Sequence, residues 1–213
     1  NDGKIGNIKE AMQKLDYLEA LGVNAIELMP INEFEGNDSW GYNPSFYFAS
    51  DKAYGTEKMY KKFIDEAHKR GMAVIGDIVL NHSFYQSPMV KMYFNDKENR
   101  PAANNPWYNE THNFENEGLR WGADFDHESP YVVDFVDRVM EHWLTEYKLD
   151  GFRFDFTKGF SNNYKSSSND EWGSNYDADR IANLKAIYDM MDNYDNESLM
   201  ICEHLAENAE EKE

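Results

Sequence analysis

Two patterns of apolar residues alternate along this chain: a spacing of three or four positions, which predicts helices, and short continuous runs, which predict strands. From Ile8 to Leu21 apolar residues recur every three or four positions, which predicts a helix, and Gly22 stands where a left-handed C-cap would end it. Residues 23–29 then form a short apolar run closed by Pro30, which is typical of a buried strand. The first part of the chain is therefore predicted as a helix followed by a strand.

The same order recurs three times. Helical periods cover residues 56–71, 130–147 and 181–191, and apolar runs predict strands at 72–80, 149–156 and 199–202. Residues 82–128 show neither period; we expect a small inserted subdomain there, because so long a structureless loop is uncommon. The predicted division is 1–81 for the first part of the main fold, 82–128 for the insertion and 129–213 for its continuation.

Helices that alternate with strands build an α/β fold around a parallel sheet, either open and doubly wound or closed into a (β/α)8 barrel. No glycine-rich phosphate-binding turn follows a predicted strand, which counts against a nucleotide-binding open sheet. Polar residues instead lie at or near the C-terminal ends of three strands: Asp77, Asn81 and His82, then Arg153 and Asp155, then Glu203 and His204. In a barrel these ends meet at one mouth, where barrel enzymes carry their catalytic residues.

Composition narrows the possible partners. The 213 residues carry a formal net charge of -19, which argues against nucleic acid and against an anionic membrane surface. No apolar run approaches the roughly 20 residues that cross a bilayer. The single cysteine excludes an intrachain disulfide and a multi-cysteine metal site.

The strand at 149–156 carries unusual chemistry for a buried segment. Phe152, Phe154 and Phe156 alternate with other residues, so Arg153 and Asp155 point the same way. Burying a carboxylate and a guanidinium costs several kcal/mol unless their hydrogen bonds are nearly ideal. The pair therefore indicates a functional site, although a structural ion pair, with Glu203 as a surface carboxylate, is the alternative.

Residues 77–82 (DIVLNH), residues 151–155 (GFRFD) and Glu203 resemble, in order and in strand context, the first three sequence signatures of the α-amylase superfamily of glycoside hydrolases. Residues 40–44 (WGYNP) are similar to the loop after the second barrel strand in pullulanase and branching-enzyme members. The resemblance implies a retaining glycoside hydrolase or transglycosylase that acts on α-glucans such as starch or glycogen. A non-catalytic carbohydrate-binding or interaction module with an amylase-like fold is the alternative.

The resemblance implies roles for individual residues. Asp155 would be the nucleophile that forms a glycosyl-enzyme ester, and Glu203 the acid and then the base. The neighbouring residue fits the role of Asp155 as a nucleophile, since Arg153 is expected to lower the pKa of Asp155 and keep its carboxylate ionised. Tyr42 would stack beneath the sugar and His82 would hydrogen-bond it, whereas outside the shared motifs a lone tyrosine usually packs and a lone histidine is a loop residue.

Further roles follow from the same resemblance. Arg153, Lys158 and His204 are also expected to bind substrate, although Lys158 could equally be a solvated lysine. Asp77 is expected to hold Arg153 in place. Asn81 and Asp124 could ligate a structural Ca2+, which prefers six to eight oxygen ligands, and no organic cofactor is expected.

The chain departs from the family in its strand count. A family barrel has eight strands; the four predicted here would be the second to the fifth, with the insertion after the third, so we expect a partial (β/α)8 barrel. The signature ending in His-Asp is not found, and we expect the chain to be incomplete and inactive alone. Its open parallel edges suggest a homodimer paired edge to edge. A polysaccharide substrate favours an extracytoplasmic location, which the sequence itself leaves unknown.

Overall fold

The computed structural model describes residues 6–213, and its N-terminal part begins with two short helices rather than one. Helix α1 (Ile8–Met12) starts with a capping box, in which Asn7 and Glu10 bond each other's backbone amides. Helix α2 (Leu15–Ala20) follows after a break at Gln13 and Lys14, and Gly22 adopts the expected positive φ of 81°. The helix predicted over residues 8–21 is thus divided in two.

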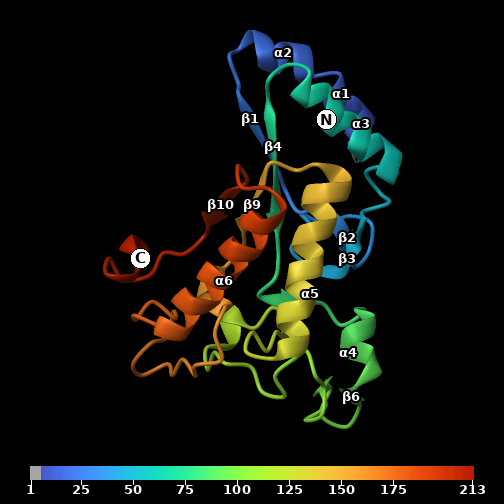
Figure 1. The fold of residues 1–213 in the computed structure, drawn as a ribbon. Coiled ribbons are helices and arrows are strands. Elements are labelled where there is room, and N and C mark those ends of the chain that lie inside the picture. Colours follow the sequence, from blue (N-terminus) through green and yellow to red (C-terminus); the bar gives the residue numbers. More distant parts are fainter. Residues whose placement is uncertain (1–5) are drawn as a thin grey trace.

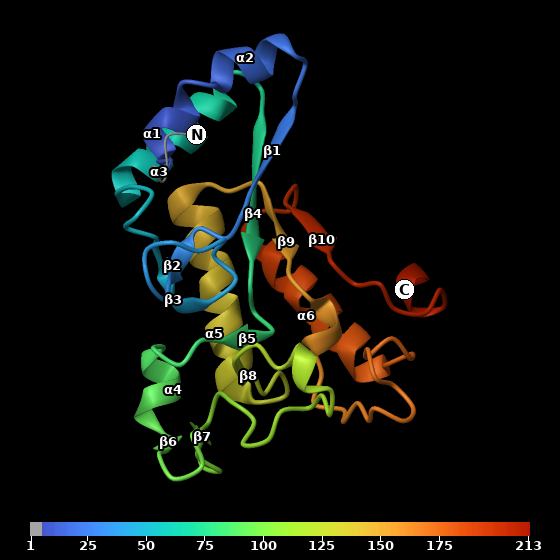
Figure 2. The ribbon, with the colours of Figure 1, turned by 180° about the vertical axis from the view of Figure 1, so that it is seen from behind.

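Four parallel strands form the central sheet. They are β1 (Ala25–Leu28), β4 (Ala73–Ile78), β9 (Gly151–Phe154) and β10 (Leu199–Cys202), and they neighbour each other in chain order. The connections contain three longer helices: α3 (Glu57–His68), α5 (Pro130–Glu141), which continues as a π-helical segment (His142–Tyr147), and α6 (Ala178–Tyr194). Helices α5 and α6 lie against one face of the sheet in both ribbon views (Figures 1 and 2). This arrangement is a partial (β/α)8 barrel.

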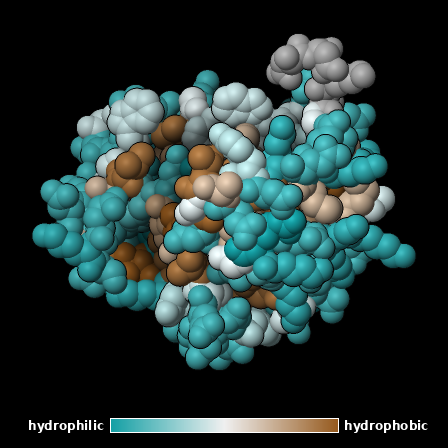
Figure 3. Space-filling model, turned by 90° about the horizontal axis from the view of Figure 1, so that it is seen from above, coloured by the Kyte–Doolittle hydropathy of each residue, from teal (hydrophilic) through white to brown (hydrophobic). Residues whose placement is uncertain are grey.

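Burial differs between the central and the edge strands. Side chains of β4 and β9 are mostly buried, whereas those of β1 and β10 are partly or fully exposed. The expectation of a buried strand at 23–29 was therefore wrong for β1, because an edge strand has a neighbour on only one side. Apolar side chains reach the surface where the molecule is seen from above (Figure 3).

Strand β10 packs unusually close to β9 at Gly151. This glycine has a φ of 149°, and a Cβ there would lie 2.2 Å from the carbonyl oxygen of Leu199. Only glycine fits so close an approach of two backbones. The strand that ends before Glu203 is thereby held directly beside the strand that ends before Asp155.

The segment 82–128 lies beyond the C-terminal ends of the sheet strands (Figure 1). Its elements are short: β5 (His82–Ser83), α4 (Pro88–Met92), β6 (Phe94–Asn95), β7 (Arg100–Pro101), η1 (Glu117–Leu119) and β8 (Ala123–Asp124). Strand β5 pairs antiparallel with β8, which returns the chain to the place where it left the sheet. The insertion therefore stands over the strand ends that carry the predicted site.

Three further features complete the fold. An antiparallel hairpin of β2 (Asn32–Phe34) and β3 (Pro44–Ser50) occupies a segment for which the sequence pattern predicted neither a helix nor a strand. Short 3-10 turns, η3 (Thr157–Gly159) and η4 (Glu210–Lys212), follow β9 and β10. Within residues 6–213, none of the helices combines the length and the apolar character needed to span a bilayer.

Candidate active site

The strand register brings the predicted catalytic residues together. Arg153 on β9 lies opposite Asp77 of β4 on one side and opposite Ile201 of β10 on the other. Asp155 and Glu203 each follow the end of their strand by one residue, so they lie on adjacent strands at the same edge of the sheet. Two carboxylates far apart in the sequence thus become neighbours.

The guanidinium group of Arg153 joins three carboxylates. Its Nη1 lies 3.0 Å from both oxygens of Asp77 and 3.2 Å from Oδ1 of Asp155. Its Nη2 lies 3.1 Å from Oε2 of Glu203. These carboxylates raise the pKa of Arg153 further, although burial opposes the charge. One fixed cation therefore orients both predicted catalytic groups, which a planar fork of donors is suited to do.

Asp155 is held in a buried, strongly polar environment. Nδ2 of Asn81 donates to its carbonyl oxygen and to its Oδ2, each at 3.0 Å. Burial, followed by the charges of Glu203 and Asp77, raises the pKa of Asp155 to about 6. Arg153 lowers this pKa, as predicted, but does not outweigh the other effects, so the expected net lowering was wrong. Asp155 is still mostly ionised at neutral pH.

The carboxylate of Glu203 is anchored on one oxygen. Its Oε2 accepts a hydrogen bond from the backbone N–H of Phe156 at 3.0 Å, in addition to the contact with Arg153. Phe156 has a φ of 45°, a left-handed conformation that is uncommon for a bulky residue. Among residues 6–213, the contacts to the Glu203 carboxylate that the structure shows are therefore both made by Oε2.

A cavity of about 390 Å³ opens at the two carboxylates. Its lining consists of Tyr42, His82, Phe84, Trp121, Asp155, Phe156 and Glu203. Four of these side chains are Tyr, Phe or Trp, whose faces suit sugar rings. Phe84, Trp121 and Phe156 were not predicted; aromatic residues beside a motif carry little signal alone, since most aromatics fill cores.

Tyr42 and His82 reach this cavity from different elements. The hydroxyl of Tyr42 donates to Oδ2 of Asp77 at 2.7 Å, which ties the ring to the same network. The ring nitrogens of His82 lie 2.6 Å from Oδ1 of Asn81 and 3.0 Å from the carbonyl oxygen of Tyr42. Burial lowers the pKa of His82 to about 4, so the ring is neutral. Both nitrogens already face protein oxygens, which differs from the predicted hydrogen bond to a sugar.

Three predicted substrate-binding residues do not line the cavity: Arg153, which lies among the three carboxylates described above, Lys158 and His204. Nζ of Lys158 lies 3.3 Å from the hydroxyl of Ser174, and the side chain is largely buried. Burial, together with the charge of Arg180, lowers the pKa of Lys158. The ring of His204 turns away from Glu203 to contact Thr157 and Glu210. Their predicted role in substrate binding is not supported by where their polar atoms lie.

The predicted calcium ligands are engaged with protein partners. Asn81 bonds Asp155 and His82, whereas Oδ2 of Asp124 accepts from Asn109 at 3.0 Å and from the backbone of Asn113 at 3.2 Å. Burial raises the pKa of Asp124 to about 7. In the described part of the chain, no three His, Cys, Asp or Glu side chains come together as a metal site. The residues present therefore do not fit a calcium site built from these side chains.

Comparison with known proteins identifies the family. The family model described as "Alpha amylase, catalytic domain" matches residues 1–121. The chain is 37% identical over 153 residues to malto-oligosyltrehalose trehalohydrolase of Saccharolobus solfataricus, covering 70% of this chain and 24% of that protein. It is 29% identical over 167 residues to alpha-amylase 2 of Dictyoglomus thermophilum, covering 76% of this chain and 28% of that one.

A solved structure supports the same grouping. The fold matches trehalose-6-phosphate hydrolase from Bacillus licheniformis with a TM-score of 0.77 and 26% identity, covering 94% of this chain and 41% of that one. The chain thus spans about a quarter of the length of the curated relatives it matches, 24% and 28% in these two cases.

Proposed function

This chain belongs to the alpha-amylase family, and from that premise we propose that it supplies the nucleophile and the acid/base of a retaining enzyme that cleaves or transfers α-glucosidic bonds. Asp155 is the proposed nucleophile and Glu203 the proposed acid/base. The observation that carries this proposal is the single guanidinium of Arg153, which lies 3.2 Å from Asp155 and 3.1 Å from Glu203.

The arrangement suits a double displacement. Retaining glycosidases need two carboxyl groups about 5 to 5.5 Å apart, one on each side of the scissile bond. Neighbouring strands and a shared cation support such a spacing. In the first step the Asp155 carboxylate attacks the anomeric carbon, the bond to the leaving oxygen breaks, and Glu203 protonates that oxygen. In the second step Glu203 removes a proton from water or a sugar hydroxyl, which displaces Asp155 and regenerates the free enzyme.

The surroundings of the carboxylates support this division of roles. With a pKa of about 6, Asp155 is ionised at neutral pH, as a nucleophile must be. Glu203 lines the cavity, and Phe156 and Arg153 hold its Oε2, so Oε1 is the proposed proton-transfer oxygen. Asp77 anchors Arg153 and Tyr42 together, so these side chains keep fixed positions. A fixed arrangement of this kind lowers the entropic cost of reaching the transition state.

The proposed substrate is an α-glucan. The aromatic lining of the cavity offers faces for one or more glucose rings, with Tyr42 as the proposed stacking residue and His82 at the cavity wall. The curated relatives named above include an alpha-amylase. Hydrolysis and transfer use the same glycosyl-enzyme ester and differ in whether water or a sugar hydroxyl attacks it.

Pairing of two copies through the sheet edges is part of the proposal. Leu199 and Ile201 on the edge strand β10 are 50% and 43% exposed, which supports a further partner at this edge. A second copy would keep all strands parallel if the two paired about an axis along the barrel. Light scattering at working concentration is expected to give the mass of a dimer, and a monomer would contradict this part.

The proposed activity is tested by the stereochemistry of cleavage. Proton NMR in the first minutes after mixing the full-length protein with a maltooligosaccharide should show the α-anomer as the first product. The β-anomer would contradict the proposed retaining mechanism. Measurable binding of the glucan by calorimetry without any cleavage would instead support a non-catalytic carbohydrate-binding module. Glu203→Gln should bind the same glucan while cleaving it far more slowly.

A further inference from the structure

Arg180 and Glu210 form a buried ion pair away from the cavity. The side chains are 0% and 1% exposed. Nε and Nη2 of Arg180 donate to the two oxygens of Glu210 at 2.5 and 2.8 Å, and the remaining donors bond the carbonyl oxygens of Lys158, Gly173 and Asn175. All five N–H donors of the guanidinium are therefore used. Such complete hydrogen bonding is what makes a buried ion pair tolerable.

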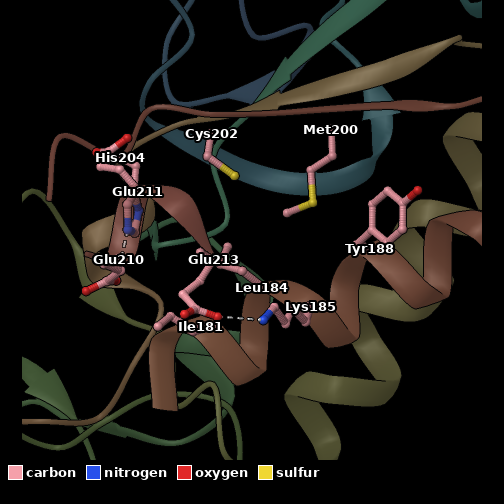
Figure 4. A pocket seen from close by; sticks show the side chains of 10 residues that line it. All are labelled: Ile181, Leu184, Lys185, Tyr188, Met200, Cys202, His204, Glu210, Glu211 and Glu213. Carbon is pink, nitrogen blue, oxygen red and sulfur yellow. Dashed lines mark hydrogen bonds and ion pairs between the residues drawn. The ribbon is translucent and has the colours of Figure 1, made fainter. Parts of the chain in front are cut away.

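His204 connects this pair to the strand end. Its Nε2 lies 2.9 Å from Oε1 of Glu210, and its Nδ1 lies 2.8 Å from the hydroxyl of Thr157 (Figure 4 shows the contact with Glu210). The Thr157 hydroxyl also lies 3.0 Å from the carbonyl oxygen of Glu203, to which it donates. The imidazole thus bridges the carboxylate of Glu210 and the hydroxyl of Thr157, and the contacts form one continuous chain.

The far end of this chain of contacts is Glu203. Both the hydroxyl and the backbone N–H of Thr157 donate to the carbonyl oxygen of Glu203 at 3.0 Å. The preceding residue, Phe156, donates its backbone N–H to the Glu203 carboxylate at 3.0 Å. Residues 156 and 157 therefore hold Glu203 at both its backbone and its side chain, with Phe156 in a left-handed conformation that needs support from its surroundings.

Glu203 needs this support because of its place in the sheet. It follows β10, which in the described residues 6–213 is an edge strand paired with β9 alone, and its side chain is 40% exposed. Two residues later Leu205 has a φ of 54°, where the chain turns away. An edge position with one neighbour gives weak restraint on its own.

We propose that Glu210 is a positioning residue for the acid/base: through His204 and Thr157, the buried Arg180–Glu210 pair fixes Glu203 for proton transfer. This inference rests on the proposed role of Glu203. A misplacement of about 1 Å can cost about 10²-fold in rate, so loss of the support should impair the proton transfer while leaving the nucleophile in place.

The test compares Glu210→Gln with Glu213→Gln, which changes a more exposed carboxylate three positions away whose ion-pair partner is Lys185 at 3.4 Å. For a maltooligosaccharide, kcat/KM of Glu210→Gln should fall about 10- to 100-fold. For α-maltosyl fluoride, whose leaving group needs little protonation, it should fall less than about 3-fold. Equal losses on the two substrates would overturn the proposal, because a general structural defect affects both steps.

A second pair of variants distinguishes loss of positioning from a folding defect in Glu210→Gln. Thr157→Val keeps the size of the side chain but removes the hydroxyl that joins His204 to Glu203, and it should reproduce the leaving-group effect. Thr157→Ser keeps the hydroxyl and should recover most of the rate. If valine and serine give the same rates, the hydroxyl is not part of the positioning and the proposal fails.

Amide hydrogen exchange separates this proposal from the proposed function. In Glu210→Gln the amides of Phe156 and Thr157 should exchange at least several-fold faster than in Glu213→Gln, whether or not the protein cleaves glucan. Unchanged exchange at these two amides would overturn the positioning role. Absence of cleavage by the unmodified full-length protein would overturn the proposed function alone, because the exchange result would stand.

Discussion

Replacing Asp155 by asparagine should abolish activity and at the same time stabilise the fold at neutral pH. The side chain is 13% exposed, and burial and the charges of Glu203 and Asp77 raise the pKa of its carboxyl from 3.8 to about 6. A raised pKa means that the ionised group is less favourable in the folded chain than in the unfolded one. The raised pKa of Asp155 already includes the attraction of Arg153. It therefore reflects a net loss of folding free energy when Asp155 is ionised.

The size of this cost follows from the shift. About 2 pKa units, at about 1.36 kcal/mol per unit, correspond to about 3 kcal/mol of destabilisation once the group is fully ionised. An asparagine at this position keeps the shape of the side chain without the charge, so we expect a gain of about 1 to 3 kcal/mol from Asp155→Asn. For a chain of this length each kcal/mol corresponds to about 2 to 4 °C in Tm.

The pH dependence distinguishes this explanation from improved packing. Below about pH 4 the folded and unfolded chains both hold the proton on Asp155, so the residue contributes nothing there. Between about pH 4 and 6 only the folded chain keeps the proton, so the penalty grows as pH rises, and above about pH 6 it is complete. The gain from Asp155→Asn should therefore be present at pH 7.5 and absent near pH 4.

Urea unfolding at the two pH values measures the gain directly. The matched control is Asp192→Asn, which neutralises an exposed carboxylate on helix α6 and should change stability by less than about 0.5 kcal/mol at either pH. A loss of stability in Asp155→Asn, or a gain of equal size at both pH values, would refute the reasoning. Groups that titrate in this range without interacting with Asp155 cancel when the variant is compared with the parent at the same pH.

Three further predictions follow from the same geometry. The acid limb of kcat/KM should lie near pH 6, because Asp155 must be ionised to attack, and a limb near pH 4 would contradict the raised pKa. Arg153→Lys should lower kcat/KM on the order of 10²-fold with circular dichroism unchanged, since a lysine cannot bridge three carboxylates as a planar fork does; a loss under about 3-fold would contradict this. Excess EDTA should leave Tm unchanged, because the side chains of Asn81 and Asp124 are used within the protein, and a drop that calcium restores would show otherwise.

Much of the fold was predictable because it depends on local patterns. Strand β10 (Leu199–Cys202) coincides with its predicted apolar run, and the other three sheet strands lie inside their predicted runs. A short apolar run between two amphipathic helices usually forms a strand of the sheet that these helices cover. The adjacency of Asp155 and Glu203 also follows from the pattern, since both stand at the ends of neighbouring parallel strands. These features depend on the order of elements rather than on distant contacts.

Other features were not predictable because they depend on distant contacts. The β2–β3 hairpin lies in a segment rich in polar and aromatic residues, where the strand period is weak. The direction of the Asp155 pKa shift depends on burial and on two carboxylates far away in the sequence. His204 was expected at the substrate because it follows Glu203, but Glu210 and Thr157 hold its ring elsewhere.

The central claim is that Asp155 forms a covalent bond to the sugar. The most direct test is to incubate the full-length protein with a fluoroglucosyl fluoride, whose intermediate hydrolyses slowly, and to map the added mass by peptide mass spectrometry. We predict one added glycosyl group on the peptide that contains Asp155, and none in Asp155→Asn. An adduct on another residue, or none while an unmodified glucan is cleaved, would contradict the account.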